Sequence, residues 1–201
     1  LHAWYGGQDE GQAVGDIIFG NVNPSGKLPF SFEKQWEDCA AYGHYPPENG
    51  HMHYAESIFV GYRHFDTNEV EPLFPFGYGL SYTSFEYSNL RQSSDGMTEG
   101  ESVTFTVDVT NTGNWGGAEV VQLYTEHAGC AVPRPAKELR RYARIDLRAG
   151  ETKSVAFTLT PEDLQFFHPE HRQWMTESGQ VGVVVGASSE DIRLRTSFTL
   201  S

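Results

Sequence analysis

The 201-residue sequence is poor in cysteine and in basic residues. Two cysteines are too few for a disulfide scaffold, and we expect Cys39 and Cys130 to be free thiols because they fall in different halves of the chain. Lys and Arg number 14 against 27 Asp and Glu, so the formal net charge is -13. Because such a surface repels phosphate, we expect no nucleic acid partner, and we interpret the short basic stretch 140–144 as a solvated strand edge.

The sequence also lacks any apolar run near the roughly 18 residues that a membrane helix needs, so we expect no membrane partner. It has no Asn-x-Ser/Thr glycosylation signal, because Asn23 is followed by proline. It opens at Leu1 without an initiator methionine or a signal-peptide core, and we therefore expect a fragment of a longer polypeptide. The sequence indicates neither the compartment in which the protein is found nor its oligomeric state.

Apolar residues recur at helical spacing in positions 13–18, which predicts a helix ending near Gly20. We expect a strand before it, at 1–5, to give a strand, glycine turn and helix as in α/β sheets. The turn from Gly6 to Glu10 is then either a ligand-side loop or a plain tight turn whose acidic residues favour a helix N-terminus.

Residues 20–57 are predicted to be irregular, because strong turn signals stand at 23–26 and 45–50. A phosphate-binding loop at 20–28 is excluded, since five residues separate its glycines and Leu28 replaces the Ser or Thr that binds magnesium. We expect a strand at Ile58–Phe65, and the aromatic segment 72–80 to close the first domain.

From about Phe85 onward, apolar and polar residues alternate with a period of two, as in half-buried strands. The alternation predicts seven short strands, at 85–90, 103–110, 118–125, 139–147, 152–160, 181–185 and 192–200. Such a series is typical of an immunoglobulin-like sandwich, and the lack of paired cysteines favours a fibronectin type III variety. The predicted fold class is an α/β remnant over 1–80 followed by an all-β immunoglobulin-like (fibronectin type III-like) sandwich over 84–201.

Candidate chemistry is sparse in the sequence itself, which has no Gly-x-Ser-x-Gly nucleophile elbow. The best metal candidates are the histidines His44, His51, His53 and His64. They have no carboxylate or thiolate at a diagnostic interval, so we expect neither a metal site nor a cofactor. The carboxylates of the first half offer a possible glycosidase pair, but no spacing identifies one among Asp9, Glu10, Asp38, Glu48 and Glu56.

Seven blocks of sequence, in a fixed order, carry a family pattern. They are Trp4–Gly11, Asp16–Pro29, Tyr54–Asp66, Pro72–Tyr82, Arg134–Leu139, Leu164–Phe167 and Val185–Ser189. Together they resemble the end of the second domain and the fibronectin-like domain of glycoside hydrolase family 3, the β-glucosidase and β-xylosidase family. The resemblance covers essentially the whole chain.

The resemblance implies hydrolysis of a β-glucoside or oligosaccharide with retention, by an Asp nucleophile on a barrel domain and a Glu acid/base on the α/β domain. Such chemistry needs two carboxylates about 5 to 5.5 Å apart, one ionised and one protonated. Both would precede Leu1, so we assign no catalytic residue in this chain. Asp9 and Glu56 are the candidate substrate-adjacent residues, although for Glu56 we favour an ion pair with Arg63 that fixes the segment between the domains.

We expect the aromatic residues Phe74, Phe76 and Tyr78 to pack between the two domains, because they are too apolar to be left in water. Trp115, on a sandwich turn, is expected to be exposed, and no other aromatic platform for polysaccharide is evident. The alternative function is a free-standing carbohydrate-binding or adhesive β-sandwich module.

Overall fold

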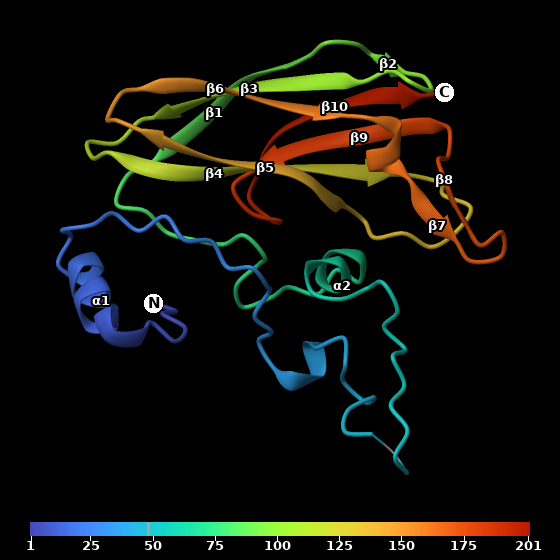
Figure 1. Cartoon of the computed structure of the whole chain (residues 1–201), viewed down its shortest axis with the longest axis horizontal. Coiled ribbons are helices and arrows are strands. Elements are labelled where there is room, and N and C mark those ends of the chain that lie inside the picture. The colour runs from blue at the N-terminus through green and yellow to red at the C-terminus, as the bar shows by residue number, and fades with distance from the viewer. Residues whose placement is uncertain (48) are drawn as a thin grey trace.

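The computed structural model describes residues 1–47 and 49–201. The helical elements are η1 (Gly7–Asp9), α1 (Glu10–Ile18), η2 (Trp36–Asp38), α2 (Tyr62–Thr67) and η3 (Pro161–Leu164). The strands are β1 (Phe85–Gln92), β2 (Gly96–Met97), β3 (Val103–Asn111), β4 (Gly117–His127), β5 (Glu138–Leu147), β6 (Thr152–Leu159), β7 (Phe166–His168), β8 (Gln173–Met175), β9 (Gly179–Gly186) and β10 (Ile192–Leu200). Figure 1 shows a strand-rich upper body with the first 80 or so residues beneath it.

The upper body is a sandwich of two sheets, with strand orders β1-β3-β6 and β2-β10-β9-β4-β5. Neighbouring strands are antiparallel except for the short β2–β10 pair, and β7 and β8 form a separate hairpin. Alternate side chains of β3 fill the space between the sheets, so that the valines and phenylalanine at 103, 105, 107 and 109 are almost fully buried. The seven predicted strands and the fibronectin-like fold class are confirmed, because a period of two is what a sheet with one buried face requires.

Two predicted strands are wrong. Residues 1–5 form no strand among the described residues, and the predicted strand at Ile58–Phe65 is replaced by a turn followed by helix α2. A strand needs a neighbour that receives its backbone hydrogen bonds, whereas a helix satisfies most of them within itself. Helix α1 is confirmed, although none of its residues is buried. No helix among the described residues is long and apolar enough to cross a membrane.

Asn111, at the end of β3, joins several parts of the sandwich through one fully buried side chain. Its amide nitrogen donates to the carbonyls of Trp115 and Leu147, at 2.7 and 3.1 Å. Its amide oxygen accepts from the Thr83 hydroxyl and from the Gly113 N–H. Because all four bonds are made inside the protein, this residue fixes where the connector, the segment 68–84 between α2 and β1, enters the sandwich.

Candidate functional site

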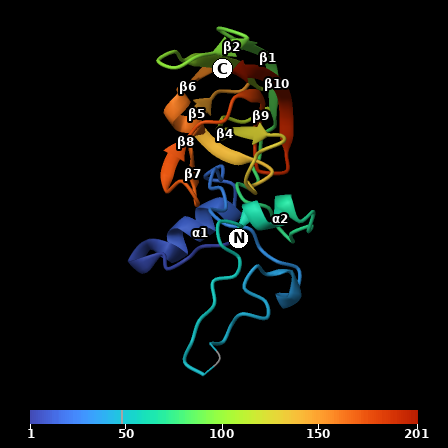
Figure 2. The same cartoon turned by 90° about the vertical axis from the view of Figure 1, so that its right-hand side faces the viewer.

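Helix α2 packs on the outer face of the five-stranded sheet, as Figure 2 shows. The Tyr62 ring lies 5.0 Å from the Phe76 ring and 5.9 Å from that of Tyr124, which belongs to β4 and is fully buried. The Tyr62 hydroxyl also accepts a hydrogen bond from the Leu139 N–H of β5, at 2.9 Å. Tyr62 therefore joins the helix, the connector and the sandwich.

We call the contact between helix α2, the connector and the five-stranded sheet the seam. Ionic and polar contacts extend this seam along the helix. Lys137 forms an ion pair with Asp66 at 2.9 Å, and both side chains are largely buried. Burial raises the pKa of Asp66, while the hydrogen bond and charge of Lys137 act in the opposite direction. At the next residue of the helix, the Thr67 hydroxyl accepts from the Ala136 N–H. The β4–β5 loop is thereby held against the helix.

Glu138 accepts bonds from two guanidinium groups, those of Arg134 at 2.8 Å and Arg140 at 2.7 Å. Burial acts to raise the pKa of Glu138, but these charges outweigh it and the pKa is lowered. The carboxylate also lies 3.9 Å from Arg63 of α2. The predicted ion pair between Glu56 and Arg63 is therefore wrong, because helix α2 turns Arg63 toward β5.

The aromatic connector residues face two directions. Phe76 is half-buried against Tyr62, and its carbonyl accepts a hydrogen bond from the Ser189 N–H of the sandwich. The Phe74 ring instead contacts Phe32 and Tyr78, with centroids 6.1 and 5.0 Å away, and remains 38% exposed. The connector thus touches the sandwich through Phe76, and through Phe74 it touches the chain around Phe32.

Gly77 lies between these aromatic residues and approaches the sheet closely. A Cβ atom at this position would be 2.6 Å from both amide atoms of Gln122, and its φ angle is +81°. The Gln122 amide is already bonded on both sides, donating to the Ala187 carbonyl and accepting from the Tyr124 hydroxyl. Only glycine fits this position without displacing that network.

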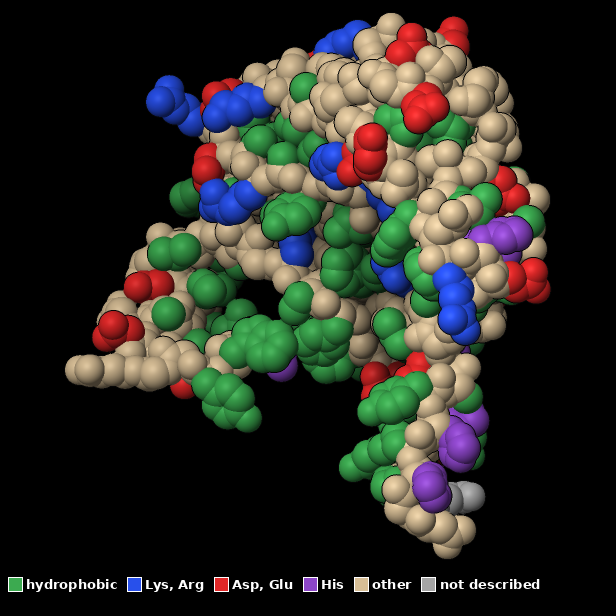
Figure 3. All heavy atoms as spheres, turned by 45° about the vertical axis from the view of Figure 1, so that its right-hand side comes forward, with side chains coloured by type: hydrophobic (Ala, Val, Ile, Leu, Met, Phe, Trp, Pro, Cys, Tyr) green, Lys and Arg blue, Asp and Glu red, His purple; other side chains and the backbone are tan. Residues whose placement is uncertain are grey.

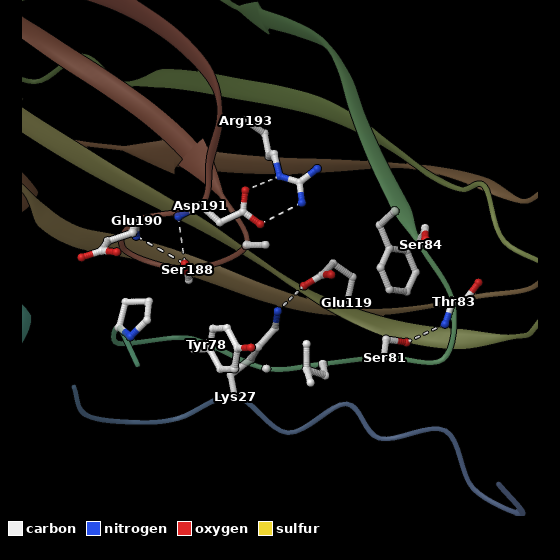
Figure 4. Close-up of a pocket in the computed structure, with 15 residues that line it drawn as sticks. Lys27, Tyr78, Ser81, Thr83, Ser84, Glu119, Ser188, Glu190, Asp191 and Arg193 are labelled. Atoms are coloured by element: carbon white, nitrogen blue, oxygen red, sulfur yellow. Dashed lines mark hydrogen bonds and ion pairs between the residues drawn. The ribbon is translucent and has the colours of Figure 1, made fainter. Parts of the chain in front are cut away.

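A polar cleft of about 700 Å³ opens beside this seam, between the connector and the turn that joins β9 to β10 (Figure 4). On one side Lys27 reaches across to Glu119 at 2.9 Å, and on the other Arg193 is paired with Asp191. The remaining lining residues come from the connector, from the first residue of β1 and from the β9–β10 turn: Pro75, Tyr78, Gly79, Leu80, Ser81, Thr83, Ser84, Phe85, Ala187, Ser188 and Glu190.

The predicted substrate-adjacent residues lie outside this cleft. Asp9 is exposed at the start of α1, and Glu56 is half-buried in a turn before α2. No ion pair or side-chain hydrogen bond joins the two within the described parts of the chain. Glu48, named as a possible carboxylate, lies outside the described residues.

The candidate histidines do not form a metal site in the described part of the chain, which holds no group of three or more His, Cys, Asp or Glu side chains placed to bind a metal ion. His64 has a structural role, since its ring contacts the Asp38 carbonyl at 3.1 Å and the Asn68 amide at 3.1 Å. Cys39 and Cys130 are free, as predicted.

The expectation that Trp115 is the one exposed sandwich aromatic is only partly right. Trp115 is 66% exposed, but Phe167 and Trp174 are also exposed and lie opposite each other on the β7–β8 hairpin. Their rings meet edge to face at 5.9 Å. The sequence signal was weak, because each strand of the hairpin has only three residues.

Comparison with protein-family models gives two matches. Residues 1–82 match the glycosyl hydrolase family 3 C-terminal domain, and residues 119–189 match a fibronectin type III-like domain. Among curated proteins, the chain is 45% identical to "Beta-glucosidase BoGH3A" of Bacteroides ovatus, over 98% of this chain and 27% of that protein. It is 41% identical to "Thermostable beta-glucosidase B" of Acetivibrio thermocellus, over 100% of this chain and 27% of that protein.

The solved structures that resemble this chain are also β-glucosidases. The β-glucosidase of Kluyveromyces marxianus, crystallised with glucose, superposes with a TM-score of 0.90 at 39% identity, over 98% of this chain and 24% of that one. DesR, a β-glucosidase from Streptomyces venezuelae, gives a TM-score of 0.91 at 38% identity, over 98% and 26%. The chain spans about a quarter of the length of these relatives. Similar to these proteins over at least 98% of its length, and matched by the two domain models over residues 1–82 and 119–189, the chain belongs to glycoside hydrolase family 3 and corresponds to its C-terminal portion.

Proposed function

We propose that this chain is the C-terminal part of a retaining β-glucosidase-type exo-glycosidase that hydrolyses terminal β-D-glucosyl residues. The observation that carries the proposal is the end-to-end similarity to β-glucosidases, in sequence and in fold, over 98% of the chain. The nucleophilic Asp and the acid/base Glu would then be supplied by residues that this chain does not contain. No catalytic residue is assigned within it.

In this proposal the chain completes the second domain and supplies a docking sandwich. Its exposed apolar surface supports that role, because 17 large hydrophobic side chains are exposed in residues 1–82 and only four in the rest of the described chain. Figure 3 shows hydrophobic side chains gathered below the sandwich. A surface of this kind is typical of a region that another part of the protein covers.

The test compares the full-length protein with the isolated 201-residue chain on p-nitrophenyl β-D-glucoside. We expect hydrolysis with retained anomeric configuration by the full-length protein and none by the chain alone, since two carboxylates at about 5 to 5.5 Å are required. Turnover by the isolated chain that is lost on Glu56→Gln or Asp9→Asn would refute the proposal. So would a full-length protein without glycosidase activity.

We also propose that Phe76 and Tyr78 fix the orientation of the sandwich, while Phe74 serves the first domain. Replacing Phe76 by Ala in the full-length enzyme should cost about 2 kcal/mol of stability, because a half-buried ring is lost from the Tyr62 contact. The Michaelis constant should stay unchanged, and Trp115→Ala, at an exposed turn, should alter neither quantity. Equal stability of the Phe76 variant and the parent in thermal unfolding would contradict this role.

A second candidate function, a carbohydrate-binding module, is favoured by the exposed Phe167–Trp174 pair, because exposed aromatic rings are surfaces on which sugar rings stack. It predicts retention of the full-length protein on insoluble β-glucan that Trp174→Ala abolishes. Equal retention of the Trp174 variant and the parent would dismiss it.

A further inference from the structure

The polar cleft between the connector and the β9–β10 turn is preformed. One end of the connector is anchored by the Phe76 carbonyl, which accepts from Ser189, and the other by the Thr83 hydroxyl, which donates to Asn111 at 2.6 Å. Between these anchors the Lys27–Glu119 ion pair crosses from the first 82 residues to β4, with both side chains largely buried. These three contacts fix the connector beside the sheet, and the cleft between them has a volume of about 700 Å³, within the size range of small-ligand sites.

The charges in the cleft nearly cancel. Lys27 is paired with Glu119 and Arg193 with Asp191, so only Glu190 has no ion-pair partner within the part of the chain that the structure describes. Burial raises the pKa of Glu190, and the nearby Asp66 adds to that effect. An anionic ligand would meet this unpaired carboxylate, whereas a neutral ligand would not be repelled.

The cleft presents hydrogen-bond donors and acceptors next to apolar rings. Figure 4 shows the Asp191–Arg193 pair facing the Lys27–Glu119 pair across the opening. Such pairs leave carboxylate lone pairs and N–H groups free at their edges, which suits hydroxyl groups that both donate and accept.

Aromatic rings add to this lining, and a buried hydroxyl lies behind it, in the core of the sandwich. Tyr78 and Phe85 supply apolar surface at the wall. Beneath Arg193, whose guanidinium lies 5.7 Å from the ring centre of Tyr87, the Tyr87 hydroxyl is buried and has no partner among the described residues.

We propose that this cleft is a binding site for a neutral sugar of one or two rings. The hydroxyl groups of the sugar bond to the two ion pairs, and its apolar C–H face packs on Tyr78 and Phe85. The proposal does not depend on the proposed hydrolytic activity, because every group that the site uses belongs to this chain.

The test measures binding of D-glucose and cellobiose to the full-length protein by saturation-transfer NMR. The protein is first treated with conduritol B epoxide, which esterifies the nucleophile of retaining β-glucosidases, and the adduct is counted by mass spectrometry. We expect saturable binding to persist in the treated protein. Arg193→Gln should weaken it at least fivefold, and Ser84→Trp, which fills the mouth without removing an ion pair, should abolish it.

Arg195→Gln is the matched control, because Arg195 lies two residues along the same strand and pairs with Glu126 outside the cleft. This variant should bind as the parent does, and D-glucuronate should bind more weakly than glucose. The proposal is overturned if the treated protein shows no saturable binding, if Ser84→Trp binds like the parent, or if Arg195→Gln is as impaired as Arg193→Gln. A protein that forms no adduct and shows no hydrolysis would instead refute the proposed activity.

Discussion

At Gly77 the connector approaches the sandwich closely. Replacing it by Ala would add a Cβ atom 2.6 Å from the Gln122 amide, at a φ of +81° that side-chain-bearing residues rarely adopt. We expect a loss of about 3 kcal/mol, because backbone strain and overpacking act together. Urea unfolding of the full-length protein and of the variant measures the difference.

Gly129 provides a control that separates the two effects. Its φ is +71°, but a Cβ atom there would have no neighbour within 4 Å. Replacing Gly129 by Ala should therefore cost about 1 kcal/mol, from strain alone. Equal losses for the Gly77 and Gly129 variants would show that the Gln122 contact is unimportant.

His127, at the end of β4, carries a pH dependence of stability. Burial lowers its pKa to about 4, and the charges of Arg134 and Arg140 add to this effect. The unfolded ring takes up a proton near pH 6.5 and the folded ring only near pH 4, so the unfolded state binds more protons between these values. Stability should fall by about 2 kcal/mol as the pH drops from 6.5 to 4, and stay independent of this residue above 6.5.

His127→Gln should remove that part of the pH dependence, as measured by urea unfolding at pH 7, 5.5 and 4. His53→Gln, at an exposed position, should keep the slope of the parent. A His127 variant with the parent's slope would place the titrating group elsewhere.

At the scale of elements, the contact between α2 and the β4–β5 loop depends on the largely buried Lys137–Asp66 pair. Lys137→Ala should lower stability by about 3 kcal/mol, because it leaves the Asp66 carboxylate buried without its cation. The double variant Asp66→Asn with Lys137→Ala should recover most of the loss. Thermal unfolding of the parent, the two single variants Lys137→Ala and Asp66→Asn, and the double variant gives the coupling between the two residues. Additive losses would show that the pair does not interact.

Whether a helix or strand could be predicted from the sequence depends on how far along the chain its contacts lie. The strands of the sandwich were predictable, because each has one buried face and so an alternating pattern. Helix α2 was not, since Phe65 is its one buried residue and Tyr62 and Asp66 are held by a surface far along the chain. Without knowledge of that surface, the six residues of α2 and their aromatic and β-branched neighbours predict a strand, because such residues favour strands.

The cleft was also beyond sequence analysis. Lys27, Glu119 and Asp191 come from three distant parts of the chain, and no local spacing connects them. The family resemblance identified the blocks around them, but it could not show which side chains meet. Which side chains meet in the cleft is decided only when the sandwich and its connector have folded.

For the molecule as a whole, the division into a dependent first part and a self-sufficient sandwich is a prediction. Residues 83–201 contain a core of two sheets, whereas helix α1 buries no residue and the first part exposes most of the large apolar side chains. A polypeptide of residues 83–201 should unfold cooperatively on heating, and residues 1–80 alone should not. Calorimetry of both pieces measures this.

The opposite result, a first part that unfolds cooperatively and a sandwich that does not, would show that the boundary near Ser84 is misplaced. A cooperative transition in both pieces would show that the first part is more self-sufficient than its burial indicates.

The two sheets of the sandwich differ in what lies on their outer faces. The five-stranded sheet carries the seam, while the outer face of β3 and β6 is lined by short polar side chains that bond to one another, such as Thr104 with Thr158 and Thr110 with Thr152. In Figure 1 this face points away from the first 82 residues. It is therefore the surface through which the protein can be attached to a solid support. A linker at the exposed Thr158 would present the seam, the cleft and any upstream domain to the solution rather than to the support.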